Sequence, residues 1–198
     1  MVHSSEMSLV QYESTGVWPK NDDLVYKAAG SKPGSNHILA RESSVLNDLA
    51  GKVGPKLIET AADGTLKMTR LGTHDLSDVM HDLRPQDVQP VISEFIHQVN
   101  DVHQLGYVHR DIKPGNLVLK MNRLRIYGVV GLVDFGMSLR INRKQDEKAA
   151  IGGTEPYSHP TQLDQKFKSM RAHPGQDWYA LGRSILHLAI GGNHGTLR

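Results

Sequence analysis

Hydrophobic and polar positions alternate over short stretches in the first third of the chain, a pattern that predicts half-buried β-strands. These stretches lie at residues 9–12, 16–18, 24–28, 53–58 and 65–71. Asp63 and Gly64 separate the last two, and this dipeptide is typical of a tight hairpin turn. The first part of the chain is therefore expected to be rich in β-structure, preceded by a tail at residues 1–8.

Apolar residues recur every three or four positions at residues 37–49 and 90–105, which predicts two amphipathic helices. In the first helix, Glu42 is expected to lie off an apolar stripe of Ile38, Leu39, Val45, Leu46 and Leu49. The second helix is expected to bury Val91, Ile92, Phe95, Ile96, Val99, Val102 and Leu105. A short helix at residues 75–80, with Thr73 or Asp75 as its cap, and a helix from Asp177 to about residue 190 complete the pattern.

Length and charge then narrow the class of protein. The 198 residues are enough for one domain or two small lobes with a real core. The net charge of +2 gives no reason to expect a nucleic-acid partner, and the absence of cysteine excludes disulfides and thiolate metal sites. No apolar run reaches the roughly 18 residues of a membrane helix, and the first residues lack a cleaved secretory signal. A soluble chain is expected, either cytoplasmic or secreted without a cleaved signal.

Three motifs in the second half of the chain carry the chemistry. Residues 109–116 read His-Arg-Asp-Ile-Lys-Pro-Gly-Asn, residues 133–136 read Val-Asp-Phe-Gly, and residues 152–160 read Gly-Gly-Thr-Glu-Pro-Tyr-Ser-His-Pro. In this order they resemble the catalytic loop, the metal-binding segment and the peptide-positioning segment of eukaryotic-type protein kinases. Lys113 is typical of the Ser/Thr-directed members. The resemblance covers roughly residues 9 to 190.

The resemblance implies ATP and Mg²⁺ as cofactors and assigns a role to each motif residue. Asp111 would orient or accept the proton of the substrate hydroxyl, and Lys113 would lie beside the transferred phosphate. Asn116 and Asp134 would hold magnesium, a hard cation that takes oxygen ligands. His109 is implied to be structural and to stack with Leu46 and Phe135.

The first part of the chain would supply the nucleotide site. Lys27 on a predicted strand would pair with the α- and β-phosphates, and Glu42 would reach Lys27 from the following helix. The residues implied to line the nucleotide site are Gly16, Val17, Val25, Lys27, Met68, Leu71 and Val118, with the backbone of residues 69–71 as the hinge that bonds the adenine. The chain departs from the family in its glycine-rich loop, because residues 13–17 contain one glycine, and Ser14 or Thr15 would have to donate to phosphate instead.

The implied fold is α+β with two lobes, a small β-rich lobe at residues 1–72 and a mainly helical lobe at residues 73–198 that lacks the late helices of the family. Pro160 is followed by Thr161 where the family has a glutamate that pairs with an arginine from those late helices. Asp177 would anchor the catalytic loop. These departures favour a naturally minimal kinase over a clipped fragment, similar to kinases that bacterial pathogens inject into host cells.

The function implied is transfer of the ATP γ-phosphate to Ser/Thr hydroxyls of a protein. The similarity to injected kinases implies a host protein as the substrate, and the sequence indicates no oligomeric state. Ser138 is the only Ser or Thr between Gly136 and Thr154, so activity without phosphorylation of that segment is expected, with Arg110 paired to Asp146 or Glu147. Two alternatives stay open. One is a kinase-like binding module with little or no turnover, which the poor glycine loop favours; the other is a small-molecule kinase, which Lys113 and residues 153–160 disfavour.

Overall fold

The computed structural model describes residues 15–21, 23–31, 34–122, 125–143, 152–164 and 171–190. Its strands are β1 (Thr15–Asn21), β2 (Leu24–Ala29), β3 (Leu57–Thr60), β4 (Leu66–Thr69), β5 (His74–Asp75), β6 (Tyr107–Val108), β7 (Leu117–Asn122), β8 (Arg125–Leu132) and β9 (Leu139–Arg140). Its α-helices are α1 (Ser35–Leu49), α2 (Leu76–Val79), α3 (Pro85–Gln104), α4 (Pro160–Leu163) and α5 (Pro174–Ala189). Short 3₁₀ turns lie at Met80–Asp82, Pro114–Asn116 and Phe135–Met137.

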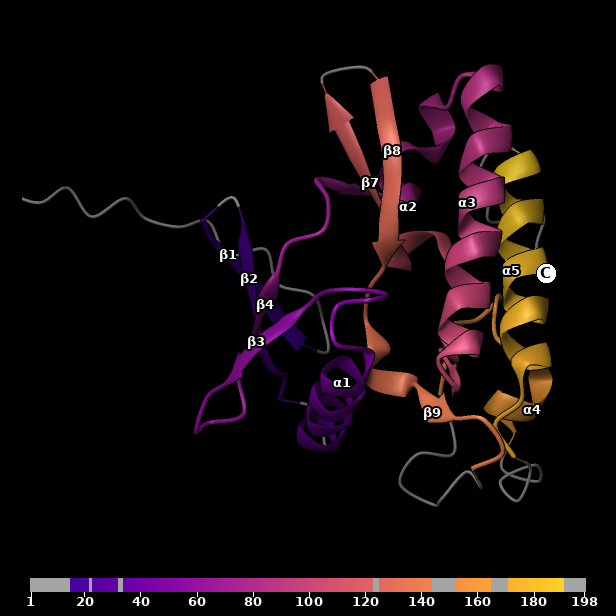
Figure 1. Ribbon diagram of the computed structural model, residues 1–198. Helices are drawn as coiled ribbons and strands as arrows, with labels where there is room; N and C mark the ends of the chain where they lie inside the picture. The colour runs from indigo at the N-terminus through magenta and orange to yellow at the C-terminus, as the bar shows by residue number, and fades with distance from the viewer. Residues whose placement is uncertain are drawn as a thin grey trace, which may run out of the picture.

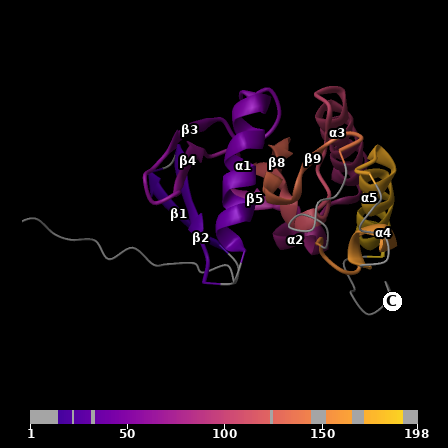
Figure 2. The same cartoon turned by 90° about the horizontal axis from the view of Figure 1, so that it is seen from below.

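The strands form three antiparallel sheets. The largest has the order β1-β2-β4-β3, and the other two have the orders β5-β7-β8 and β6-β9. The four-stranded sheet and α1 lie on one side of the molecule, whereas α3 and α5 lie side by side on the other (Figure 1). The β7–β8 hairpin lies between these two sides (Figure 1). The view from below shows the same separation (Figure 2). This confirms the α+β class, and the lobe boundary at Gly72 stays a prediction.

Several predicted strands need new bounds. The strand expected at residues 9–12 lies outside the described residues, and β1 extends beyond residues 16–18 to Asn21. The strand expected from residue 53 begins at Leu57, because Gly54 has a φ of +74° and Pro55 has no N–H for a ladder bond. The hairpin turn at Asp63 and Gly64 is confirmed, with the Gly64 N–H donating to the Ala61 carbonyl at 2.9 Å.

The helices also differ from the sequence analysis in several places. Helices α1 and α5 begin at Ser35 and Pro174, two and three residues before their predicted starts. Helix α3 begins at Pro85, five residues before the predicted start, and accommodates Pro90 inside it. Pro85 is a better first residue because its missing N–H needs no partner there. Ile96 is 39 % exposed, contrary to prediction, since the buried stripe is confined to Val91, Phe95, Val99 and Val102. Glu42 lies on the buried face of α1 instead of off its stripe.

One continuous core joins the two sides of the molecule. Leu46 of α1 and Phe135 are both fully buried in it. The His109 ring lies 4.7 Å from the Phe135 ring, centroid to centroid, so the predicted packing of His109 against Phe135 is confirmed. Within the described residues, no helix has both the length and the apolar composition needed to cross a membrane.

Gly72 lies between β4 and β5, where there is no room for a side chain. A Cβ added there would lie 2.3 Å from Cγ1 of Val118 and 2.5 Å from the carbonyl oxygen of Leu119. Gly72→Ala is therefore expected to lower the free energy of unfolding by about 1–3 kcal/mol, as overpacking does. Urea denaturation would measure it.

The matched control is Gly182→Ala on α5, where an added Cβ meets no atom within 4 Å. Alanine has the higher helix propensity, so this variant is expected to gain up to about 1 kcal/mol. Equal effects of the two substitutions would contradict the packing described for Gly72.

Candidate active site

The side chains of the catalytic loop converge on the carboxylate of Asp111. Its Oδ2 accepts from Nζ of Lys113 at 2.8 Å and from Nδ2 of Asn116 at 3.1 Å. Its Oδ1 accepts from the Thr154 hydroxyl at 2.8 Å, and that hydroxyl accepts from Lys113 Nζ, also at 2.8 Å. Asp111, Lys113 and Thr154 thus form a closed triangle of hydrogen bonds. The structure thus brings Asp111, Lys113 and Asn116 together, as predicted. It adds Thr154, which the sequence analysis named only as part of the peptide-positioning motif.

His109 connects this loop with the segment that carries Asp134. Its Nδ1 accepts from the backbone N–H of Asp111 at 3.3 Å, and its Nε2 donates to the carbonyl of Val133 at 3.1 Å. The carbonyl of Asn116 accepts from the Val133 N–H at 3.0 Å. The two segments are therefore held side by side, which places Asn116 and Asp134 at the same end of the site.

Lys27 forms the second charged cluster, with partners from two other elements. Its Nζ donates to Glu42 of α1 at 2.7 Å and to Asp134 at 2.9 Å. Burial disfavours the charged form of Lys27, but the two carboxylates outweigh it and raise the pKa of this residue. The predicted Lys27–Glu42 contact is confirmed, and Asp134 joins it.

The two carboxylates respond differently to the same ammonium. Burial is the dominant influence on Glu42 and raises its pKa despite the Lys27 contact. Burial acts in the same sense on Asp134, but the attraction of Lys27 outweighs it and holds the pKa of Asp134 below its usual range. Asp134 is therefore ionised at neutral pH, the state in which a carboxylate binds a metal ion.

The residues predicted to hold magnesium have a suitable donor set. Both hydrogen bonds from Asn116 to Asp111 use the amide nitrogen, so its amide oxygen is the atom that could serve a cation. The Asp134 side chain is 42 % exposed although its Oδ1 contacts Lys27. Oxygen ligands of this kind suit Mg²⁺.

The residues predicted to line the nucleotide site include members of β1, β2, β4 and β7. Gly16 and Val17 lie on β1, where Val17 pairs with Lys27 across the sheet. Val25 of β2 pairs with the buried Met68 of β4. Val118 lies on β7 and packs against Gly72.

The backbone of the predicted hinge, residues 69–71, is partly hydrogen-bonded within the protein. The N–H groups of Thr69 and Arg70 donate to the carbonyls of Lys56 at 3.0 Å and Asp23 at 2.8 Å. These two N–H groups are thus bonded within the protein, and the role of residues 69–71 and of Leu71 in binding adenine stays a prediction.

Asp177 at the start of α5 anchors the catalytic loop, as predicted. Its fully buried carboxylate accepts from the backbone N–H groups of His109 and Arg110, both at 2.7 Å. His103 of α3 also contacts Oδ2 at 2.8 Å through Nε2. A single carboxylate therefore joins α5, α3 and the two residues that precede Asp111.

Helix α5 also holds the peptide-positioning segment. The Arg183 Nε donates to the carbonyl of Pro156 at 3.1 Å, and the Tyr157 hydroxyl bonds to Nδ1 of His187. Ser138 is 1 % exposed and its hydroxyl donates to the His109 carbonyl at 3.2 Å, which disfavours it as a phosphorylation site. Asp146 and Glu147, which were predicted to pair with Arg110, lie outside the described residues.

Asp177→Asn is expected to lower the free energy of unfolding by about 3 kcal/mol, because the amide cannot accept every bond that the buried carboxylate accepts. Urea denaturation of this variant and of Asp82→Asn, which changes an exposed carboxylate, would test the difference. The Asp82 variant should stay within about 0.5 kcal/mol of wild type. Two variants of equal stability would show that Asp177 does not anchor the loop.

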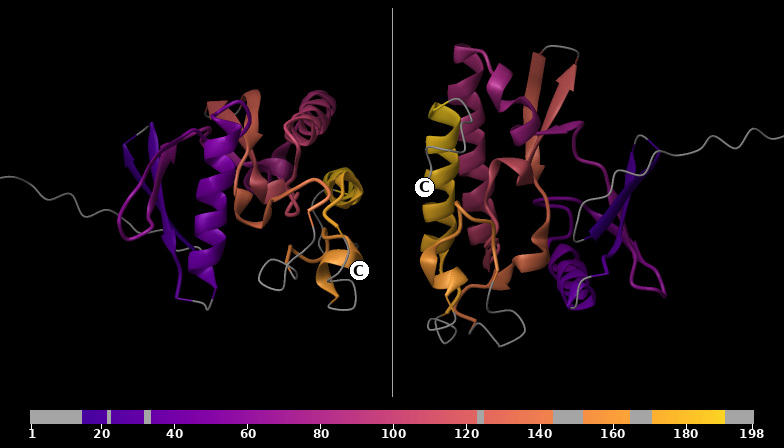
Figure 3. Two further views of the ribbon diagram at one scale, coloured as in Figure 1. Left: turned by 60° about the horizontal axis from the view of Figure 1, so that its bottom comes forward. Right: turned by 180° about the vertical axis from the view of Figure 1, so that it is seen from behind.

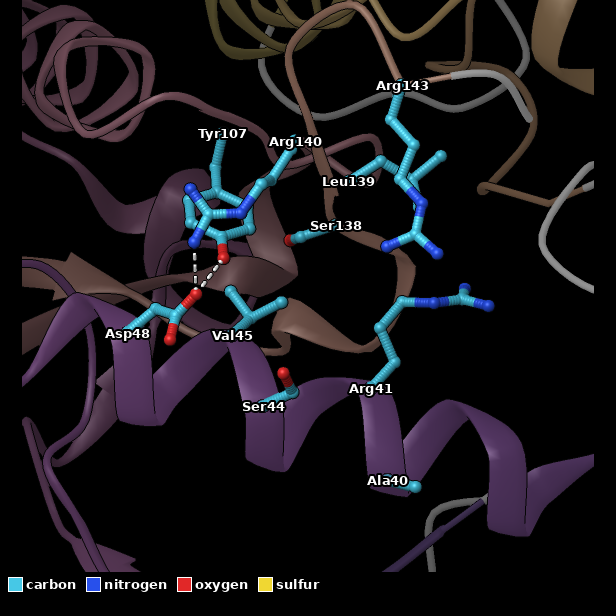
Figure 4. A pocket seen from close by; sticks show the side chains of 10 residues that line it. All are labelled: Ala40, Arg41, Ser44, Val45, Asp48, Tyr107, Ser138, Leu139, Arg140 and Arg143. Carbon is cyan, nitrogen blue, oxygen red and sulfur yellow. Dashed lines mark hydrogen bonds and ion pairs between the residues drawn. The ribbon is translucent and has the colours of Figure 1, made fainter. Parts of the chain in front are cut away.

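A separate cavity of about 360 Å³ lies between α1 and β9. At one end, the Tyr107 hydroxyl and the Arg140 guanidinium both bond to Oδ2 of Asp48, and the guanidinium lies over the Tyr107 ring (Figure 4). Arg41 and Arg143 line the other end (Figure 4). The cavity contains none of Lys27, Asp111, Asn116 and Asp134, so it is distinct from the candidate active site.

Burial and the bond to Asp48 raise the pKa of Tyr107 to about 12 from a usual value of 10.0. The folded state thus favours the neutral phenol, and this stabilisation is complete below about pH 10 and is lost as the pH rises toward 12. Between about pH 9 and pH 11, the free energy of unfolding of wild type should fall by about 1 kcal/mol more than that of Tyr107→Phe.

Urea denaturation at the two pH values would measure this difference. Tyr179→Phe removes an exposed phenol and is the matched control. Parallel pH dependences for wild type and Tyr107→Phe would rule out the proposed stabilisation.

Comparison with known proteins agrees with this geometry. The protein kinase domain family matches residues 31–194. Serine/threonine-protein kinase MRCK gamma from Mus musculus is 38 % identical over 113 residues, which cover 55 % of this chain and 7 % of the relative. Serine/threonine-protein kinase MRCK beta from Homo sapiens is 34 % identical over 113 residues (56 % and 6 %), and Citron Rho-interacting kinase from Mus musculus is 39 % identical over 107 residues (52 % and 5 %).

The family match covers most of the chain. The chain therefore belongs to the protein kinase family, as the motifs predicted. It spans less than a tenth of the length of these relatives.

Proposed function

We propose that this chain transfers the γ-phosphate of ATP to Ser or Thr hydroxyls of a protein, with Mg²⁺ as cofactor. The observation that carries the proposal is the triangle of Asp111, Lys113 and Thr154. In it the Asp111 carboxylate already accepts a hydrogen bond from an aliphatic hydroxyl at 2.8 Å. A Ser or Thr of a substrate has the same group and could bond in the same way.

The chemistry follows from these contacts. Asp111 orients the substrate hydroxyl and takes its proton as the oxygen forms a bond to the γ-phosphorus. The bond from that phosphorus to the oxygen bridging the β- and γ-phosphates breaks, and ADP leaves with the bond electrons. Lys113 lies 2.8 Å from Asp111 and places a positive charge where the phosphoryl oxygens gain negative charge.

The Lys27 cluster would hold the nucleotide. Lys27 Nζ is fixed by Glu42 and Asp134, so its position is set before ATP binds, and a fixed ammonium costs less entropy to use than a mobile one. When bound at Asn116 and Asp134, Mg²⁺ would neutralise phosphate charge. Val25, Met68, Leu71 and Val118 would contact the adenine, and Gly16 and Val17 would cover the nucleotide.

Two facts support protein Ser/Thr residues as the acceptors. The relatives MRCK gamma and MRCK beta are named serine/threonine-protein kinases. In this chain, Lys113 of the catalytic loop donates to Thr154 of the peptide-positioning segment. A host protein as substrate, and a role as an injected effector, stay predictions from the resemblance.

Asp111→Asn is expected to reduce phosphoryl transfer by about 10²–10⁴-fold, the usual contribution of a proton-accepting group. Transfer of labelled phosphate from ATP to casein and to the chain itself, with Mg²⁺ present, would measure it. Asp82→Asn, an exposed change outside the site, should keep the wild-type rate. ATP affinity and cooperative unfolding, measured for each variant, separate loss of chemistry from loss of structure.

Each other outcome selects a different function. Nucleotide-dependent binding of a protein by wild type, with no transfer to any protein, would overturn catalysis in favour of a kinase-like binding module. Transfer to an aminoglycoside or a sugar, with none to protein, would favour a small-molecule kinase.

A further inference from the structure

Gln162 is a buried amide between the catalytic loop and the segment that carries Thr154. It lies on α4, is 1 % exposed, and donates from Nε2 to the carbonyl oxygen of Arg110 at 2.7 Å. The same nitrogen lies 3.4 Å from the carbonyl oxygen of Gly152, whose N–H donates to the Gln162 carbonyl at 3.2 Å. Burying an amide is unfavourable unless it is hydrogen-bonded, so these contacts determine where the side chain lies.

The bond to Arg110 acts on the peptide unit that leads into Asp111. Arg110 has a φ of +70°, a left-handed conformation that residues other than glycine rarely adopt. The Arg110 N–H donates to Asp177 at 2.7 Å, and the Arg110 carbonyl accepts from Gln162 at 2.7 Å. Rotation of the Arg110–Asp111 peptide unit would break the Gln162 bond and would also move the Asp111 carboxylate.

The second contact brings in the peptide-positioning segment. Gly152 lies two residues before Thr154, and Gly153 between them has a φ of +134°. A Cβ added at Gly153 would lie 2.0 Å from the Ser158 hydroxyl oxygen and 3.4 Å from the Arg110 carbonyl oxygen. The segment therefore passes directly against the catalytic loop, and the Gln162 amide contacts both.

We propose that Gln162 is a positioning residue for phosphoryl transfer, because it sets the position of the Asp111 carboxylate relative to the Thr154 segment, where the acceptor would bind. The inference rests on the proposed function. It concerns the acceptor side of the reaction, since the contacts of Gln162 do not include Lys27, Glu42 or Asp134. Its loss should therefore affect kcat and the KM for the protein acceptor, and not the KM for ATP.

Two substitutions separate hydrogen bonding from packing. Gln162→Met keeps the length and volume of the side chain but cannot donate to the Arg110 carbonyl. Gln162→Glu places a carboxylate there, which can donate only when it is protonated. Gln89→Met makes the same change as the first variant at an exposed position on α3 and is the matched control.

Steady-state transfer to casein would test the proposal. Gln162→Met is expected to lower kcat by about tenfold or more, as a small misplacement of reacting groups does, with the KM for ATP within about twofold of wild type. Relative to wild type, Gln162→Glu should recover kcat as the pH falls from about 8 to about 5.5, because burial raises the pKa of a carboxyl and the acid form restores the donor. Gln89→Met should match wild type throughout.

Retention of wild-type kcat and acceptor KM by Gln162→Met would overturn the proposal. So would a Gln162→Glu profile parallel to that of wild type, since loss of packing alone has no such pH dependence. If wild type transfers no phosphate, the proposed function fails and amide hydrogen exchange decides the structural part. Faster exchange at residues 108–117 in Gln162→Met than in Gln89→Met supports positioning of the loop, and equal exchange overturns it.

Discussion

The geometry of the site depends on the hydrogen bonds made by the buried carboxylate of Asp177. A charge without solvent is costly, and here it is compensated by two backbone N–H donors at 2.7 Å and by His103 at 2.8 Å. The donors belong to His109 and Arg110, the residues just before Asp111. The left-handed backbone of Arg110 is unfavourable by itself, so the loop needs an external constraint of this strength.

The Lys27 cluster has a different role, since it joins parts of the chain that are far apart. Lys27 lies on β2 of the four-stranded sheet, Glu42 lies on α1, and Asp134 follows β8. Two further views show the four-stranded sheet and α1 on one side of the molecule and the helices α3 and α5 on the other (Figure 3). A buried ion pair contributes little net stability, but removing one partner leaves an uncompensated charge. The cluster is therefore better understood as a constraint on geometry, which holds α1 and the Asp134 segment in one arrangement.

The sequence predicted contacts within the candidate site better than the bounds of the elements. Lys27 and Glu42 were expected to pair, and Lys27 Nζ lies 2.7 Å from the Glu42 carboxylate. Its contact with Asp134 at 2.9 Å was not predicted. The family motifs consist of the residue types that the chemistry requires, so these residues can be recognised in the sequence before the fold is known. The start of α3 was wrong because Pro85 and Pro90 are both plausible first residues, and only packing decides between them.

Glu42 shows why burial was harder to predict. A periodic pattern places charged residues on the solvent side of a helix, yet Glu42 is 1 % exposed because Lys27 neutralises it from another element. Thr154 was found only as a motif letter, since its bond to Asp111 joins residues 43 positions apart. Gln162 follows no motif at all, and no local signal distinguishes it from an exposed glutamine.

The polar contacts around α4 explain how the peptide-positioning segment is held with Thr161 in place of a glutamate. Gln176 of α5 contacts the Thr161 hydroxyl at 3.3 Å, and Gln162 reaches the catalytic loop at 2.7 Å. Neutral amides need fewer compensating contacts than a buried carboxylate, because their desolvation cost is smaller. Two amides and a hydroxyl therefore hold this segment against α5 and Arg110, together with the bond from Arg183 of α5 to the Pro156 carbonyl.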